Sequence, residues 1–153
     1  TLWAQPAGGT VHAECASGRA AAGQATTVQE TDELPARSVK CTDAGQPAIE
    51  IIPFDSQDAA TNAVVLGQAD AMSADSPVTL YAIKQTNGKL VQAGEVFDSA
   101  PYGWPVEKGS PLAQSLLQAL EHLIETGQYK EIAANWGLEE GMIDKPVING
   151  AVS

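Results

Sequence analysis

The chain has 153 residues, of which 44% are hydrophobic and 18% are charged, a balance typical of a folded globular protein. Nineteen acidic residues against eight basic ones give a net charge of −11, which argues against a nucleic acid partner and against binding to anionic membrane surfaces. No apolar stretch approaches the roughly 20 residues that a membrane-spanning helix needs.

The first part of the chain, residues 1–18, contains Pro6 and a pair of glycines among scattered polar residues. This composition predicts a connector with little regular structure that enters a domain. The short apolar run over residues 19–24 follows Gly18 and predicts a buried strand, because Gly23 disfavours a helix there.

A helix start is predicted directly after that strand. Thr27 and Glu30 have the spacing of a capping box, in which a hydroxyl and a carboxylate satisfy backbone amides at a helix N-terminus. We expect the helix to run from Thr27 through Leu34 toward Arg37, with Pro35 ending or bending it early.

Strands and helices continue to alternate after this helix. The expected elements are a strand over 48–54, a helix capped by Asp55 or Ser56 and closed by Gly67, a strand over 69–73, a helix over 78–84 with Asp75 as its N-cap, and a strand over 89–92. This order predicts an α/β lobe with a mostly parallel sheet, helices on both faces and a binding site at the carboxyl ends of the strands.

The pattern changes after Gly94. An extended segment over 100–106 precedes an amphipathic helix whose apolar face runs from Leu112 to Ile124, and a shorter helix ends at Gly137. The sequence thus divides into a connector over 1–18, a lobe over 19–94 and a returning segment over 95–153.

The two cysteines, Cys15 and Cys41, flank one strand and helix and lack a redox-active spacing. A structural disulfide fits this placement, and it implies an oxidising, extracytoplasmic compartment. The alternative is a pair of unrelated reduced thiols.

Two groups of residues at predicted strand ends suit a small zwitterion. Ala25, Thr26 and Thr27 form the turn at a helix start, where unsatisfied amides and the threonine hydroxyls suit a carboxylate or phosphate. Asp75 follows the next strand but one and suits an ammonium group. Each also has a simpler interpretation, since Thr27 and Asp75 are both ordinary helix-capping residues. Together they predict an amino acid as ligand.

We find no pattern that predicts catalysis, a metal site or a cofactor. No nucleophile stands beside a base, and there is no glycine-rich phosphate loop. His12 and His122 are far apart, and His122 is expected on an exposed helix face. Trp3, Trp104 and Trp136 are expected to pack in a core.

The order of several short motifs resembles the extracellular solute-binding proteins of family 3, which serve amino-acid ABC transporters. The motifs are Gln24-Ala25-Thr26-Thr27, Asp58-Ala59-Ala60, Val64-Val65-Leu66-Gly67-Gln68-Ala69-Asp70-Ala71, Asp75-Ser76-Pro77, Tyr81, Pro101-Tyr102-Gly103, Gly127-Gln128-Tyr129-Lys130 and Asn135-Trp136-Gly137. The placement of Cys15 and Cys41 resembles a disulfide of actinobacterial members, which are typically lipid-anchored outside the membrane.

The resemblance implies a periplasmic-binding fold in which the residue matching Thr27 holds the ligand carboxylate and the acid matching Asp75 holds the ammonium group. Members usually have glycine where Ala25 stands, and many have a small apolar residue where Pro105 stands. The implied partners are an amino acid and the permease subunits of an importer.

Intact members of this family have a first lobe that this chain largely lacks, so the resemblance also implies weak ligand binding. The apolar face from Leu112 to Ile124 would normally pack on that lobe, and its exposure predicts self-association. Two alternatives of the same fold are a ligand-sensing or interaction domain and a dehydratase-like enzyme.

Overall fold

The computed structural model describes residues 1–8 and 20–150, and it separates the chain into two compact units, Thr1–Phe97 and Asp98–Ser153. Among the described residues, no helix combines the length and the apolar character needed to cross a membrane.

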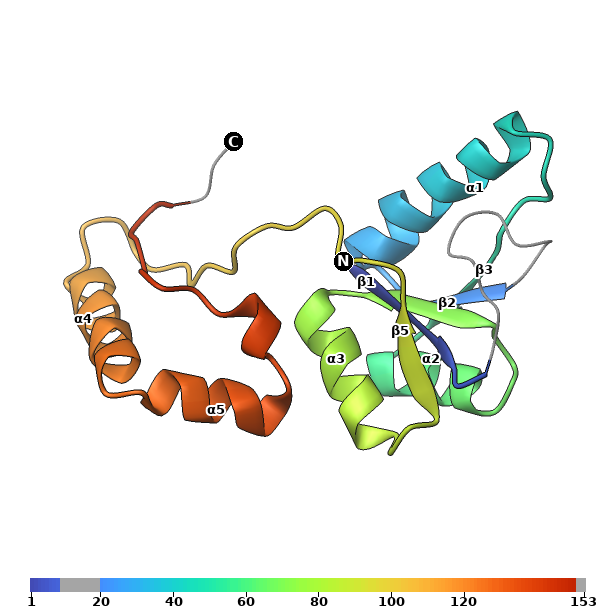
Figure 1. Ribbon diagram of the computed structural model, residues 1–153. Coiled ribbons are helices and arrows are strands. Elements are labelled where there is room, and N and C mark those ends of the chain that lie inside the picture. The colour runs from blue at the N-terminus through green and yellow to red at the C-terminus, as the bar shows by residue number, and fades with distance from the viewer. Residues whose placement is uncertain (9–19, 151–153) are drawn as a thin grey trace. The chain divides into compact units, whose positions relative to one another are not determined.

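A five-stranded sheet forms the centre of the first unit (Figure 1). Its strands are β1 (Leu2–Pro6), β2 (Ala20–Gln24), β3 (Glu50–Phe54), β4 (Ala71–Ala74) and β5 (Leu90–Ala93), in the order β3-β2-β4-β1-β5. β2 pairs in parallel with β3 and β4, whereas β1 runs antiparallel to β4 and β5. The sheet is therefore mixed, and β1 alone of its strands opposes the predicted common direction.

β1 corrects the prediction of a weakly structured connector over residues 1–18 for its first part, while residues 9–18 lie outside the described residues. Leu2, Trp3 and Ala4 are buried, and β1 lies between β4 and β5 inside the sheet. Pro6 and the following glycines are turn signals, but Pro6 is the last residue of a short apolar strand that gains its stability from two neighbours far along the chain. The predicted boundary at residue 18 does not hold, because the lobe begins at β1.

Helices cover both faces of the sheet, with α1 (Leu34–Asp43) on one face and α2 (Gln57–Val65) and α3 (Ser76–Gln85) on the other (Figure 1). The pleat explains this arrangement, because successive residues of a strand point to opposite faces. Trp3, Ala21 and Ala71 belong to the core cluster that contains Leu34 of α1. The residues that follow them in the chain are Ala4, Ala22 and Met72. These three point to the other face and belong to a second cluster that contains Ala60, Ala63 and Val64 of α2.

The first helix is longer than predicted and does not stop at Pro35. A π-helical turn, η1 (Gln29–Glu33), leads directly into α1, which ends at Asp43. Pro35 is the second residue of α1, next to the π-helical turn, and it does not end the helix. This helix packs on β2 at Gly23, where a Cβ atom would make ordinary contacts of 3.5 Å with Glu30 Cβ and Leu34 Cδ1.

The other predicted elements of the first unit are confirmed, with ends shifted by a few residues. Ser56 caps α2 by accepting a hydrogen bond from the Ala59 amide at 3.2 Å, as one of the two predicted caps. Pro53 lies in β3, an edge strand of the sheet, where a lost amide donor is tolerated.

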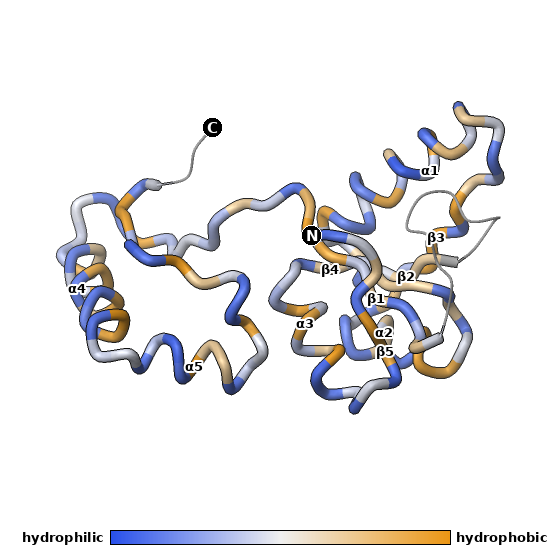
Figure 2. Tube along the Cα trace, in the orientation of Figure 1, coloured by the Kyte–Doolittle hydropathy of each residue, from blue (hydrophilic) through white to orange (hydrophobic). Residues whose placement is uncertain are grey.

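The second unit contains α4 (Leu112–Glu125), α5 (Gln128–Trp136) and the 3₁₀ turn η2 (Glu139–Gly141). The extended segment expected over 100–106 forms no strand, and Pro101 and Pro105 each remove a backbone donor there. Hydrophobic and hydrophilic positions alternate around α4 (Figure 2), yet none of its side chains is buried. Its predicted amphipathic face is therefore present, with Leu112 exposed and its other leucines only half-buried.

Candidate functional site

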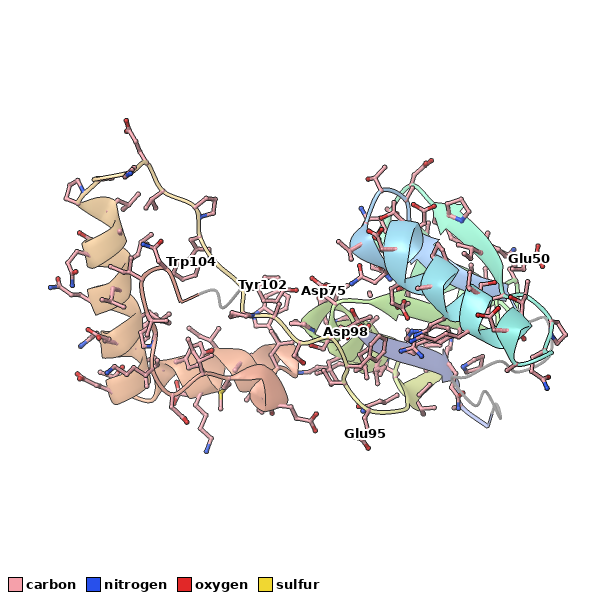
Figure 3. The ribbon with its side chains drawn as sticks, turned by 90° about the horizontal axis from the view of Figure 1, so that it is seen from above. Glu50, Asp75, Glu95, Asp98, Tyr102 and Trp104 are labelled. Carbon is pink, nitrogen blue, oxygen red and sulfur yellow. The ribbon has the colours of Figure 1, made fainter. Side chains whose placement is uncertain are left out.

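The turn after β2 and the residue after β4 lie side by side at the carboxyl ends of these two parallel strands, and this end is called the edge of the sheet below. β2 and β4 pair in parallel with Ala22 opposite Met72, so three further residues bring Ala25 level with Asp75. Glu50 begins the parallel strand β3 and therefore lies at the opposite edge from Asp75, as Figure 3 shows. The structure thus brings the two predicted groups of site residues together.

Thr26 is the unusual residue of the turn. Its φ of 66° lies in the left-handed region, which a β-branched residue rarely adopts. Its side chain is exposed, and its backbone N–H donates to Glu30 Oε2 at 3.1 Å. The left-handed residue thus comes one position after Ala25, whose amide donates to the Phe54 carbonyl at 2.8 Å.

Thr27 closes the turn and does not cap the helix. Its Oγ1 donates to the Gln24 carbonyl at 2.7 Å, and its N–H points to the same oxygen at 3.4 Å. The predicted capping box is therefore wrong, because the Thr27 hydroxyl bonds to Gln24 and the Glu30 carboxylate accepts from Thr26 rather than from Thr27.

Asp75 stands at the N-cap position of α3, but its carboxylate makes no capping hydrogen bond. Its Oδ1 accepts a hydrogen bond from Gln29 Nε2 at 2.8 Å. The predicted capping role is therefore wrong for the side chain, which is held toward the start of the helix that follows β2.

Gln29 is a site residue that the sequence did not reveal. It lies in the π-helical turn, its side chain is only 7% exposed, and its Nε2 also lies 3.3 Å from Thr1 Oγ1. The available signal was its place two residues after Thr27, on a helix turn that must face the sheet.

A second polar cluster lies one helical turn further along. Glu33 accepts hydrogen bonds from Trp3 Nε1 at 3.1 Å and from Ser73 Oγ at 2.7 Å, and it forms an ion pair with Arg37. The Arg37 guanidinium lies 4.1 Å from the centre of the Phe97 ring and 5.4 Å from that of Trp3. This cluster fastens the helix to β1 and β4.

Trp3 is buried, as predicted, but the other two tryptophans are not. Trp104 is 65% exposed and Trp136 is 49% exposed, so neither belongs to a core in this chain. The reason is that the second unit has too few packed layers to enclose large rings.

The remaining predicted residues have simpler outcomes. Cys41 is buried and disulfide-bonded, while Cys15, its predicted partner, lies outside the described residues, as does His12. His122 is exposed on α4. Within the described ranges, no three potential ligands from His, Cys, Asp and Glu gather into a metal site.

The chain is similar to several amino-acid-binding proteins. It is 40% identical over 136 residues to the arginine-binding protein ArgT of Corynebacterium glutamicum, a match that covers 89% of the chain and 45% of that protein. It is 32% identical over 95 residues to the ABC transporter glutamine-binding protein GlnH of Bacillus subtilis, covering 61% of the chain and 34% of that protein. The chain is a homologue of part of the amino-acid solute-binding proteins. No family model matches it.

Solved structures agree with this relationship. An ancestral arginine-binding protein bound to arginine superposes with a TM-score of 0.59 and 26% identity, over 88% of this chain and 58% of that one. The fold is thus that of a type II periplasmic-binding protein, as predicted, and these relatives are binding proteins rather than enzymes. The chain spans less than half the length of the two sequence relatives.

Proposed function

We propose that this chain binds the backbone ammonium and carboxylate groups of an amino acid at the edge of the sheet formed by the turn after β2 and by Asp75. In the whole protein this edge is one side of the ligand site of an ABC importer. The proposal rests above all on Asp75, whose carboxylate faces the start of the η1 helix instead of capping its own helix.

The arrangement of charge supports a zwitterion rather than a simple anion. A helix N-terminus carries partial positive charge, and the η1 helix starts directly after the turn that follows β2. The Asp75 carboxylate follows β4, the strand that pairs with β2. An amino acid has both complementary charges, separated by one carbon atom. The sequence relatives are named for binding arginine and glutamine, which supports the same class of ligand.

The Glu30 carboxylate would compete with the ligand carboxylate for the backbone donor at the helix start. Glu30 already accepts the Thr26 amide, and the Thr27 hydroxyl is bonded to Gln24. A bound amino acid would replace the Glu30 carboxylate at Thr26, so the chain should bind its ligand weakly.

Titration calorimetry with L-arginine tests the proposal, with two derivatives that lack either the carboxylate or the free ammonium group. Hydrogen bonds to charged groups contribute about 1.5 to 3 kcal/mol, so Asp75→Asn should weaken arginine binding about 10-fold to 100-fold. Asp43→Asn makes the same charge change at an exposed position at the end of α1 and should have no effect. Equal binding of arginine and of the derivative without an ammonium group would contradict the proposal.

The whole protein is proposed to act outside the cytoplasm and to deliver its ligand to permease subunits. The disulfide at Cys41 supports an oxidising compartment, because cytosolic thiols are kept reduced. The similarity of the chain to a binding protein of an ABC transporter supports permease subunits as the partner.

We also propose that the chain self-associates through the apolar face of α4, over Leu112–Ile124. The leucines of this face are at least partly exposed, and no side chain of α4 is buried. Burial against a second copy would remove this apolar surface from water.

A further inference from the structure

Gln29 joins the two charged ends of the proposed ligand site. It lies in the first turn of the helix whose start faces the ligand carboxylate, and its side-chain amide donates to Asp75 Oδ1 at 2.8 Å. Gln29 is nearly inaccessible to solvent, whereas Asp75 is partly exposed. The amide therefore approaches the carboxylate from the protein side.

This contact explains why Asp75 does not cap α3. An aspartate at an N-cap position normally turns its carboxylate toward the amides of the following turn. Here the Asp75 backbone has the extended geometry of an N-cap, with φ −58° and ψ 142°, but the side chain accepts from Gln29 instead. The Gln29 amide is itself held close to Thr1 Oγ1, at 3.3 Å.

We infer that Gln29 is a positioning residue that holds the Asp75 carboxylate in the orientation that receives the ligand ammonium group. Gln29 does not itself need to touch the ligand. An ordered carboxylate loses less conformational freedom when it binds a cation, so the orientation raises affinity without adding a ligand contact. The inference rests on the proposed function.

A set of variants separates positioning from a general effect on folding. Gln29→Met keeps the length of the side chain and removes the donor, and Gln85→Met makes the same change at an exposed position near the end of α3. Gln29→Met should weaken L-arginine binding about 10-fold, the equivalent of one lost hydrogen bond to a charged group. Gln85→Met should leave binding unchanged.

Two further measurements show how the loss arises. The arginine derivative without a free ammonium group should bind Gln29→Met and the unsubstituted chain equally, because it makes no contact with Asp75. In the Asp75→Asn background, Gln29→Met should cause little further loss, since coupled residues are not additive.

The outcomes distinguish a failure of the Gln29 inference from a failure of the proposed function. If Gln29→Met weakens both ligands equally, or causes the same loss with Asn at position 75, Gln29 has only a structural role and the inference is wrong. Unchanged arginine binding by Gln29→Met also overturns it. If the unsubstituted chain fails to distinguish arginine from its derivative, the proposed function fails and the inference falls with it.

Discussion

At the scale of single residues, the site is governed by competition for the few donors at the helix start. Thr26 adopts a left-handed conformation that costs roughly 1 to 2 kcal/mol for a residue with a Cβ atom, and its amide is bonded to Glu30. Strained residues of this kind are common at binding sites. The Glu30 carboxylate therefore occupies the donor at which we propose that the ligand carboxylate binds.

Replacing Glu30 with alanine should strengthen amino-acid binding. The Thr26 amide becomes available and one negative charge leaves the helix start, so we expect affinity for L-arginine to rise about threefold to tenfold, on the scale of one exchanged hydrogen bond. Calorimetry measures the change. Asp32→Ala removes the same charge from the same helical turn without freeing that amide. Equal gains in both variants would show that charge alone is responsible.

At the scale of elements, η1 and α1 form one helix with a polar stripe on a face that packs against the sheet. Gln29, Glu33 and Arg37 are spaced four residues apart, and each contacts a residue distant in sequence. Residues at this spacing lie along one helix face. The stripe connects the proposed ligand site to the aromatic rings of Trp3 and Phe97.

Replacing Glu33 with glutamine should destabilise the first unit. The change leaves Arg37 without its charged partner and weakens the bonds from Trp3 and Ser73. Losing one partner of a fully buried pair costs about 3 to 5 kcal/mol, and we expect about 2 to 3 kcal/mol here because Arg37 is partly exposed.

Urea unfolding followed by circular dichroism measures this loss. Glu50→Gln makes the same substitution at an exposed position on the edge strand β3 and should change the free energy of unfolding by less than about 0.5 kcal/mol. Similar values for the two variants would refute a structural role for the Glu33 cluster.

At the scale of the whole molecule, the two units of the chain differ in their packing. The first unit has a sheet and two core clusters, whereas in the second unit α4 has no buried side chain. The apolar face of α4 is only half-buried, and most helical stability in proteins comes from packing of such a face. An external partner surface is therefore expected for α4.

Light scattering coupled to size-exclusion chromatography tests self-association. The unsubstituted chain should show a mass above 15.9 kDa that grows with concentration. Leu120→Glu places a charge on the apolar face and should restore the monomer mass, whereas Gln118→Glu on the exposed side of α4 should not. A mass of 15.9 kDa at every concentration would exclude association through this face.

Local patterns in the sequence predicted most of the elements and suggested the residues of the candidate site. Alternating apolar runs and capping residues predicted β2 to β5 and all five α-helices, and the motif order indicated the family fold. Thr26, Thr27 and Asp75 were recognisable because turns and strand ends depend on neighbouring residues. The same local signals misassigned β1, whose five residues form a strand only between two partners.

Only the tertiary structure decided what the polar side chains do. The Thr27 and Asp75 side chains were expected to cap helices, but Thr27 donates to the Gln24 carbonyl and Asp75 accepts from Gln29. Gln29 and Glu33 resembled ordinary surface residues of a helix, and their burial depends on contacts with residues 28 to 46 positions away. The sequence identified Asp75 as a candidate from its place after a strand. It could not predict the orientation of the Asp75 carboxylate, since Gln29 on another element sets that orientation.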